Sequence, residues 1–400
     1  MTQQKVAMLT AGGLAPCLSA VVSMLIKRYD KVAPDIELIA YRSGYQGLLL
    51  GDRIEITQNM REKADLLKFY GGSPIGNSRV KLTNVADCMK RQLIKENENP
   101  LEVAANRLIE DKVSILHTIG GDDTNTTASD LVDYLSKRSY KLTVVGVPKT
   151  IDNDISPIHQ SLGALTAAKL GAKFFDNISN ECTAAPFSLI IHEVMGRNCG
   201  WLTAATARSY IEMIQGNEYA DGFMISSNSK SIDGIYLPEM QFDLVQEAER
   251  LKAVINNKGS VSIFVSEGAC LDAIIAEREA SGVKLQRDAF GHVRLNAINV
   301  GDWFSEKFAE LIGAKRSIVQ KSGYFVRSAA SEEEDLQLIE KMVILAVDSA
   351  LSRISGVIGE DETQGNVLKV IDFKNIRGGK AFNVSIPWFS DVLKHTGQNI

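Results

Sequence analysis

At 400 residues the chain is long enough for two α/β lobes, and its 45% hydrophobic and 23% charged residues are typical of a globular protein. The formal net charge of -5 argues against a broad basic surface for nucleic acid or an anionic membrane, so phosphate binding would need a local cluster of cations. The five cysteines are odd in number and form no CxxC pair, which predicts reduced thiols and neither a disulfide framework nor a zinc site.

The N-terminal segment does not resemble a targeting sequence. Met1–Leu9 (MTQQKVAML) lacks the basic start and long apolar core of a signal peptide. No apolar run approaches the length that spans a bilayer. We therefore expect a cytoplasmic protein that does not enter a membrane.

Short apolar runs alternate with longer amphipathic stretches, the pattern of parallel βαβ units. Lys5–Thr10 predicts the first strand, and Pro16–Tyr29 predicts a helix with its apolar residues on one side. The acid run Glu332–Asp335 fits the start of a helix, where it complements the helix dipole. Further strands are expected at Ile36–Tyr41, Val113–Ile119, Leu142–Val147, Phe187–Val194 and Ser260–Val265.

Four loops that follow predicted strands hold the unusual residues, and such loops converge where parallel sheets bind ligands. The first is Thr10–Pro16 (TAGGLAP), with two glycines between a strand and a helix. Glycines let a phosphate approach backbone N–H groups, but a tight turn explains them equally well. Because the loop matches neither GxGxxG nor a Walker A pattern, neither a dinucleotide site nor a P-loop is supported.

The second loop, Gly120–Thr126 (GGDDTNT), places Asp122 and Asp123 at the end of a buried strand. Adjacent carboxylates are costly there unless a cation is present. Magnesium bound to substrate phosphates fits these oxygen ligands. Capping of the next helix by Asp123 or Thr124 is the competing interpretation, and both can hold.

The third loop, Pro148–Asp154 (PKTIDND), holds two carboxylates one residue apart, with Lys149 three positions before Asp152. A carboxylate near a lysine and a metal can accept a hydroxyl proton while the oxygen attacks phosphorus. The competing interpretation is an Asx-type turn that caps a helix around Ser161–Lys173. That turn explains Asp154 well and Lys149 poorly.

The fourth loop, Met195–Trp201 (MGRNCGW), offers Arg197 to a phosphate or sugar oxygen. Glu267 follows the last predicted strand and can accept sugar hydroxyls, while Arg327 in GYFVR is a second arginine for phosphate. Arg79 ends another glycine-rich loop. The histidines form no catalytic arrangement, since neither HExxH nor a GxSxG elbow occurs.

Taken in this order, TAGG, GGDDT, PKTIDND, MGR, SEG and GYxxR resemble the phosphofructokinase family. The similarity runs from about residue 5 to about residue 335, and TIDND followed by MGR is its most specific part. The resemblance implies an α/β fold of two Rossmann-like lobes with mainly parallel sheets and the active site in the cleft between them. We expect a donor lobe of residues 1–160 with about 331–375, and a fructose 6-phosphate lobe of residues 161–330 with about 376–400.

The resemblance also implies a role for each matched residue. Asp152 matches the acceptor of the C1 hydroxyl proton of fructose 6-phosphate, and Asp122 matches the Mg²⁺ ligand. Gly13 matches the glycine that approaches the donor phosphates, and Arg79 matches an arginine that touches the transferring group. The other matched positions, expected to bind substrate, are Thr150, Ile151, Met195, Gly196, Arg197, Glu267, Tyr324 and Arg327.

Two positions indicate the donor. ATP-dependent members that resemble this chain carry glycine where Asp123 and Lys149 stand, and the combination here is the pattern of pyrophosphate-dependent members. A carboxylate at residue 123 would repel the α-phosphate of ATP, and Lys149 would bring positive charge to pyrophosphate. The resemblance therefore implies reversible transfer from pyrophosphate to fructose 6-phosphate in glycolysis or gluconeogenesis.

The stretch Pro186–Glu193 has no arginine matching the one that crosses a subunit interface in bacterial ATP-dependent enzymes, so a homodimer is expected. Three alternatives stay open. The first is ATP as the donor, the second is another acceptor such as sedoheptulose 7-phosphate or a distant lipid or NAD kinase that carries GGD, and the third is a sugar-phosphate sensor without activity. Activity assays with pyrophosphate and with ATP distinguish the first alternative from the main prediction. The joint presence of Asp122, Lys149, Asp152 and Arg197 speaks against the third.

Overall fold

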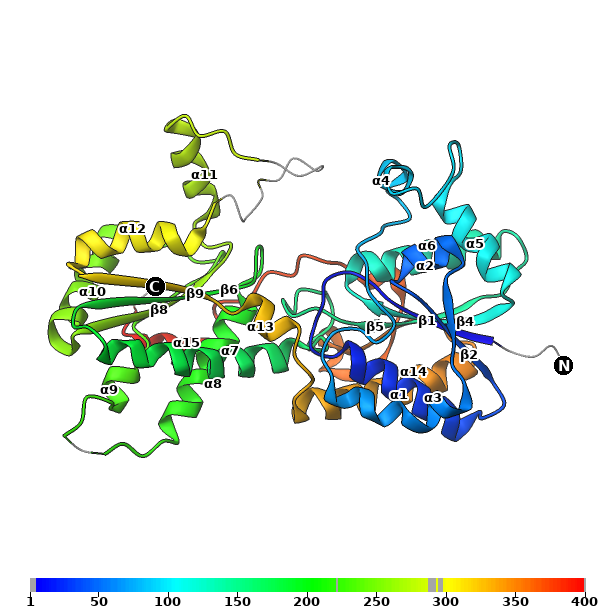
Figure 1. Cartoon of the computed structure of the whole chain (residues 1–400), viewed down its shortest axis with the longest axis horizontal. Coiled ribbons are helices and arrows are strands. Elements are labelled where there is room, and N and C mark those ends of the chain that lie inside the picture. The colour runs from blue at the N-terminus through cyan, green and yellow to red at the C-terminus, as the bar shows by residue number, and fades with distance from the viewer. Residues whose placement is uncertain (1–4, 221, 287–292, 294–297, 399–400) are drawn as a thin grey trace. The chain divides into compact units, whose positions relative to one another are not determined.

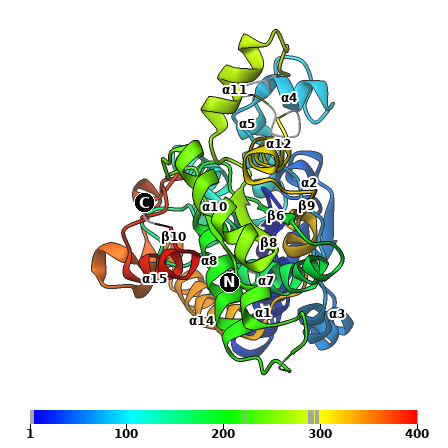
Figure 2. The same cartoon turned by 90° about the vertical axis from the view of Figure 1, so that its left-hand side faces the viewer.

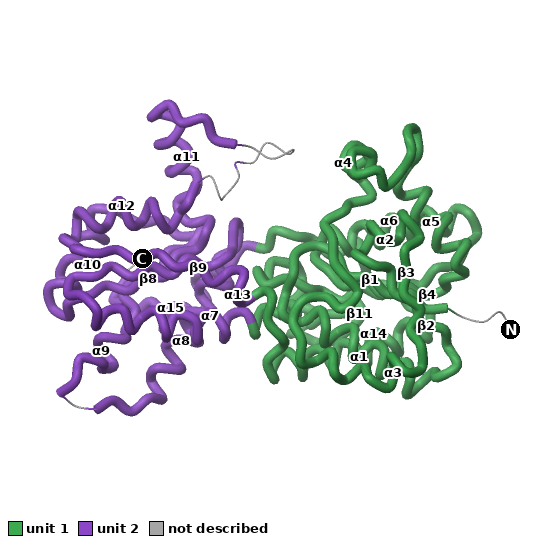
Figure 3. The backbone as a smooth tube through the Cα atoms, viewed as in Figure 1, with its two compact units in different colours: residues 1–166, 327–380 green, residues 167–326, 381–400 purple. Residues whose placement is uncertain are grey.

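The computed structural model describes residues 5–398 apart from 221, 287–292 and 294–297. The chain forms two compact units (Figure 3). Unit 1 comprises residues 1–166 with 327–380, and unit 2 comprises residues 167–326 with 381–400. In the part of the chain described, no helix combines the length and apolar character needed to cross a bilayer.

Unit 1 is built on a mostly parallel sheet that, in the described residues, has seven strands in the order β11-β10-β5-β4-β1-β2-β3 (Figure 1). The edge strands β3 and β11 run antiparallel to their neighbours. β4 and β5 are nearly continuous buried runs, as expected for strands covered on both faces. The strands are β1 (Lys5–Thr10), β2 (Glu37–Tyr41), β3 (Arg53–Glu55), β4 (Val113–Gly120), β5 (Thr143–Pro148), β10 (Gly356–Asp361) and β11 (Val367–Ile371).

Helices cover both faces of this sheet. In Figure 1, α1 and α14 lie on one face and pack against each other, while α2, α5 and α6 lie on the other. The α-helices of unit 1 are α1 (Leu18–Val32), α2 (Tyr45–Leu50), α3 (Gln58–Lys63), α4 (Val85–Lys90), α5 (Pro100–Glu110), α6 (Asp122–Ser136) and α14 (Glu333–Leu351). Its 3-10 helices are η1 (Ala64–Phe69), η4 (Glu362–Gln364) and η5 (Phe373–Asn375).

Unit 2 has a smaller sheet, with parallel strands in the order β7-β8-β6-β9 among its described residues. Figures 1 and 2 show α12 on one side of β6 and β8 and α7 on the other. The strands are β6 (Ser188–Val194), β7 (Gly234–Tyr236), β8 (Ser260–Ser266) and β9 (Arg316–Lys321). The helices are α7 (Ala164–Ser179), η2 (Asn180–Thr183), α8 (Trp201–Gln215), α9 (Ser227–Lys230), α10 (Leu244–Lys258), α11 (Leu271–Ala280), α12 (Val300–Ile312), α13 (Gly323–Arg327) and α15 (Pro387–Thr396).

The predicted strands are confirmed, and their ends differ from the prediction by no more than one residue. The first helix begins at Leu18, because Pro16 and Cys17 form a turn before it. The helix expected around Ser161–Lys173 begins only at Ala164. Its first residues instead follow the third loop, where Leu162 N–H donates to Pro148 O at 3.1 Å.

The predicted acidic start of α14 is confirmed, and Asp335 has a further role. Its buried carboxylate accepts hydrogen bonds from Gly163 N–H at 3.0 Å and Thr166 N–H at 2.7 Å. Burial raises the pKa of Asp335. This residue therefore caps α7, the role that the alternative interpretation of the third loop gave to Asp154.

The loops that carry the predicted site of unit 1 leave the sheet at one edge. β1, β4 and β5 are adjacent parallel strands. Ala11 N–H donates to Ile119 O at 3.0 Å, and Lys149 N–H donates to Gly120 O at 2.9 Å. Consequently the first, second and third loops start side by side.

Candidate active site

The loop after β1 is fixed against the glycine-rich loop that carries Arg79. Gly12 N–H donates to Ser78 O at 2.9 Å, and Asn77 Nδ2 donates to Gly12 O at 2.7 Å. Gly12 has a φ of +89°, a conformation that favours glycine. A Cβ atom on Gly13 would lie 3.4 Å from Arg79 Nη2, so these two predicted residues are neighbours.

Lys149 is a buried cation beside the same glycines. It is 3% exposed, and its Nζ donates a short hydrogen bond to Gly13 O. A Cβ atom on Gly12 would lie 3.2 Å from this Nζ. Burial lowers the pKa of Lys149 to about 8, and the charge of Arg79 acts in the same direction. Two cations and the backbone of two glycines therefore meet at one place, which suits an anionic ligand.

Asp122 and Asp123 both lie in the first turn of α6. The N-cap of this helix is Gly121, so the interpretation of Asp123 or Thr124 as the cap is wrong. Asp123 is exposed and forms an ion pair with Lys81, with 2.5 Å between Oδ2 and Nζ. Sequence reasoning missed Lys81 because no local pattern connects it to a residue on another loop.

The third loop is a compact turn around Thr150. The Thr150 hydroxyl accepts a hydrogen bond from Asp152 N–H at 3.1 Å and donates to Asp154 Oδ1 at 3.2 Å. Asp152 is partly exposed and Ile151 is buried. Burial raises the pKa of Asp154, and the charge of Asp122 adds to this shift. Carboxylates from the second and third loops therefore lie near each other.

Asn153 holds the back of this turn. It is 3% exposed and has a φ of 52°, in the left-handed region. Its Nδ2 donates to His159 O at 3.0 Å, and its Oδ1 accepts from Ser161 N–H at 2.8 Å. The Ser161 hydroxyl lies 2.8 Å from Thr150 O and 3.0 Å from Asn153 Oδ1. Asparagine tolerates this backbone better than most residues, which was the available sequence signal for its role.

A further segment near these carboxylates was not predicted. Arg377–Lys380 (RGGK) follows η5, and Lys380 N–H donates to Asp154 O at 2.9 Å. Gly378 lies against Asp122, because a Cβ atom at residue 378 would have three atoms of that aspartate within 3.0 Å. A glycine pair between two cations was the only signal, and it lies more than two hundred residues from the second loop.

In unit 2, the fourth loop is bonded to Glu267. Glu267 Oε1 accepts a hydrogen bond from Gly196 N–H at 3.2 Å, and Ser266 Oγ donates to Gly196 O at 2.5 Å. Burial raises the pKa of Glu267. Arg197 Nη2 donates to Val293 O at 2.7 Å. These residues follow the paired strands β6 and β8, so their positions have a common origin in the sheet.

The remaining predicted residues lie on or beside α13. Met195 contacts Gly323, whose Cβ atom would lie within 3.0 Å of three atoms of the Met195 side chain. Tyr324 is 75% exposed. The predicted residues in unit 1 are Gly13, Arg79, Asp122, Asp123, Lys149, Thr150, Ile151, Asp152 and Arg327, and those in unit 2 are Met195, Gly196, Arg197, Glu267 and Tyr324.

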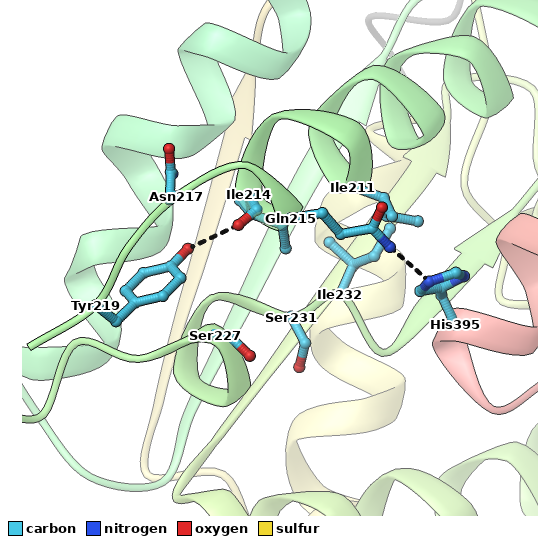
Figure 4. Close-up of a pocket in the computed structure, with 9 residues that line it drawn as sticks. All are labelled: Ile211, Ile214, Gln215, Asn217, Tyr219, Ser227, Ser231, Ile232 and His395. Atoms are coloured by element: carbon cyan, nitrogen blue, oxygen red, sulfur yellow. Dashed lines mark hydrogen bonds between the residues drawn. The ribbon is translucent and has the colours of Figure 1, made fainter. Parts of the chain in front are cut away.

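A cavity of about 370 Å³ in unit 2 is separate from these residues (Figure 4). Ile211, Ile214 and Ile232 give it an apolar wall, and His395 pairs with Gln215 at 2.8 Å across its rim. Among the described residues, no acidic or permanently cationic side chain lines it. The cavity therefore lacks the charged groups that phosphate chemistry needs.

A family model described as Phosphofructokinase matches residues 5–350. The chain belongs to the phosphofructokinase family. The match includes all four loops identified above. It ends before β10, β11 and the segment Arg377–Lys380, so these later parts of the phosphofructokinase chain stand outside the shared model.

Curated relatives match this phosphofructokinase along nearly its whole length. A protein of Methylotuvimicrobium alcaliphilum is 55% identical over 396 residues, covering 99% of this chain and 97% of its own. A protein of Propionibacterium freudenreichii is 53% identical over 395 residues, covering 99% and 98%. Both are named pyrophosphate–fructose 6-phosphate 1-phosphotransferase.

The fold is shared with solved phosphofructokinases. The pyrophosphate-dependent phosphofructokinase of Marinobacter aquaeolei superposes with a TM-score of 0.69 at 19% identity, covering 98% of this chain and 91% of that one. At this identity the likeness concerns the fold alone. Together with the two mainly parallel sheets, it confirms the predicted α/β phosphofructokinase architecture.

Proposed function

We propose that this chain transfers a phosphoryl group from pyrophosphate to the C1 hydroxyl of fructose 6-phosphate, giving fructose 1,6-bisphosphate and phosphate. The observation that carries the proposal is the common name of relatives that share more than half of their residues with nearly the whole chain. The reaction is reversible and serves glycolysis or gluconeogenesis in the cytoplasm. The enzyme acts as a homodimer.

Asp123 and Lys149 support pyrophosphate as the donor. Lys149 lies with Arg79 beside Gly12 and Gly13, where two cations can neutralise the charge of a small polyphosphate. Asp123 is kept in place by Lys81, and its exposed carboxylate would repel a further phosphate group. Both effects favour pyrophosphate over ATP.

Asp152 is the proposed general base. Its backbone is bonded to Thr150 in a turn that Asn153 holds from behind, so the carboxylate needs little reorganisation. As the C1 oxygen attacks the terminal phosphorus, Asp152 takes the hydroxyl proton. The new P–O bond forms while the bond to the departing phosphate breaks.

Mg²⁺ is the proposed cofactor, with Asp122 as its protein ligand. The carboxylate oxygens of the second and third loops fit a hard cation, and the charge of Asp122 already disfavours ionised Asp154. In the described residues no group of three or more His, Cys, Asp or Glu could hold a metal alone. That agrees with an ion that takes other ligands from phosphate. When bound, Mg²⁺ would neutralise charge on the pyrophosphate oxygens.

A second group of residues is proposed to bind fructose 6-phosphate, which accepts the phosphoryl group. Arg197 and Arg327 would form charge-assisted hydrogen bonds with phosphate oxygens. Glu267 would accept sugar hydroxyls, and the hydrogen bond from Gly196 orients its carboxylate. Met195 and Tyr324 would contact the sugar from the same unit.

Activity of the purified protein with pyrophosphate and with ATP tests the donor. We expect turnover with pyrophosphate, and turnover with ATP alone would overturn the proposal.

Asp152→Asn tests the base: kcat should fall by about 10²- to 10⁴-fold while fructose 6-phosphate binding is retained. Asp391→Asn makes the same change on the exposed face of α15 and should leave kcat unchanged. Unchanged turnover of Asp152→Asn would refute the assigned role.

A further inference from the structure

The backbone at Gly378 packs directly on Asp122. A Cβ atom at residue 378 would have Oδ2, Cγ and Cβ of Asp122 all within 3.0 Å. Because three atoms of a short side chain occupy this space, rotation of the carboxylate alone does not clear it. Only glycine lets the two backbones approach this closely without moving Asp122.

The segment around Gly378 has little freedom to move away. Arg377 N–H donates to Ser156 O at 3.0 Å, and Ser156 N–H donates to Arg377 O at 2.8 Å. Lys380 N–H donates to Asp154 O at 2.9 Å, and its Nζ donates to Ile158 O at 2.6 Å. Relief of a clash at residue 378 by shifting the segment would break these bonds.

The same four residues therefore join the second loop to the third. Gly378 packs against Asp122, while Arg377 and Lys380 are hydrogen-bonded to Ser156 and Asp154 in the chain that follows Asp152. Two like charges at Asp122 and Asp154 would separate if their backbones were free to do so. Rigid backbone contacts keep them near each other.

We propose that Gly378 is a positioning residue for the metal: Arg377–Lys380 holds the Asp122 carboxylate at the distance from the third loop that binds Mg²⁺ with pyrophosphate. This rests on the function proposed above. Gly378 lies outside the part of the chain that the family model matches, because that match ends at residue 350. Partners that orient a metal ligand commonly change metal affinity by about 10- to 100-fold when they are altered.

Gly378→Ala and Gly365→Ala form a matched pair. Gly365 lies in an exposed turn outside Arg377–Lys380 and has a φ of +68°, so alanine there strains the backbone, but no described atom lies within 4 Å of its Cβ position. Mn²⁺ serves as the probe, and its binding is followed by electron paramagnetic resonance with inorganic pyrophosphate present and fructose 6-phosphate absent. We expect Gly378→Ala to weaken Mn²⁺ binding about 10- to 100-fold. Gly365→Ala should bind Mn²⁺ as the wild type does.

Equal Mn²⁺ affinity in Gly378→Ala and wild type, or an equal loss in both glycine variants, would overturn the proposal. Thermal unfolding gives a second measurement. Gly378→Ala should lower Tm much more in the wild-type background than in an Asp122→Ala background, because the Asp122 Oδ2 and Cγ atoms, which make the closest contacts, are then absent. An equal loss of Tm or of folding in both backgrounds would mean that the glycine serves the fold alone, which also overturns the proposal.

The test is separable from the proposed function. Wild-type protein that binds Mn²⁺ with pyrophosphate but transfers nothing to fructose 6-phosphate would contradict that function and leave the comparison of the glycine variants intact. Transfer by wild-type protein together with unaltered Mn²⁺ binding in Gly378→Ala would contradict only the role of Gly378.

Discussion

Two buried lysines, one in each unit, have different partners. In unit 2, Lys258 is bonded to the buried carboxylate of Asp233 at 2.7 Å, and Arg250 is bonded to Glu247 at 2.8 Å. In unit 1, Lys149 is as deeply buried, yet its Nζ donates to the carbonyl of Gly13. Among the described residues no carboxylate lies within ion-pair distance of that Nζ.

The difference in partners indicates different roles for the two buried lysines. Charges that neutralise each other inside the fold need no further partner, and losing one of them leaves the other stranded. A buried cation without an ion-pair partner is costly, and burial lowers the pKa of Lys149 although the charges of Asp152 and Asp154 act in the opposite direction. Such a cation is useful when a ligand brings the missing negative charge. We therefore predict that Lys149 acts in ligand binding and that Lys258 acts in stability.

The largest expected effect is the loss of stability when Lys258 is replaced. Lys258→Met leaves the Asp233 carboxylate buried without its cation, so the free energy of unfolding should fall by about 3–5 kcal/mol. The kcat of the folded protein should stay at the wild-type value. Urea unfolding and steady-state assays measure the two quantities. A double variant with Asp233→Leu should recover much of the loss, and no recovery would show that the pair is not the cause.

Lys149→Met should have the opposite pattern. Removal of a cation that faces the transferring phosphate should lower kcat/KM for pyrophosphate by about 10²- to 10³-fold. The free energy of unfolding should not fall, because the variant no longer buries an uncompensated charge. A loss of stability like that of Lys258→Met, with kcat/KM retained, would reverse the assignment of the two lysines.

Asn153→Ala tests whether an uncharged residue that supports the third loop affects catalysis. It removes the bonds to His159 O and Ser161 N–H, so the free energy of unfolding should fall by about 1–3 kcal/mol. Because Asp152 then loses its fixed position, kcat should fall while the KM for pyrophosphate stays near the wild-type value. Asn366→Ala, at an exposed residue with a φ of 63°, controls for backbone strain and should leave kcat unchanged. Equal kcat losses in the two variants would exclude a positioning role.

The sequence predicts what depends on local pattern. The runs Val113–Ile119 and Leu142–Val147 are rich enough in apolar residues that strands covered on both faces are expected there. Parallel pairing of such strands then brings Asp122 and Lys149 to one edge of the sheet. The predicted grouping of the second and third loops follows from these two facts.

What the sequence did not predict depends on contacts between distant segments. Lys81 reaches Asp123 only because two loops meet, and no periodicity records that meeting. Gly378 is a steric requirement, visible once the position of Asp122 is known. The cap of α7 is likewise supplied by Asp335, which follows it in the chain by more than a hundred residues.

The smallest expected effect is the pH dependence that comes from Lys149. Rising pH should increase the contribution of this residue to stability and decrease the rate. The folded pKa is about 8, below the ordinary value of about 10.4. Between these values the unfolded chain holds a proton that the folded chain has lost, so this residue makes stability rise with pH in that window. The rate should fall as the pH rises through about 8, because folded Lys149 then loses the charge that we propose faces pyrophosphate. Stability is compared between wild type and Lys149→Met, and Lys149→Arg should move the alkaline decline of the rate to higher pH. If Lys149→Arg keeps activity but declines at the wild-type pH, another group controls the rate and the buried lysine is not the titrating cation.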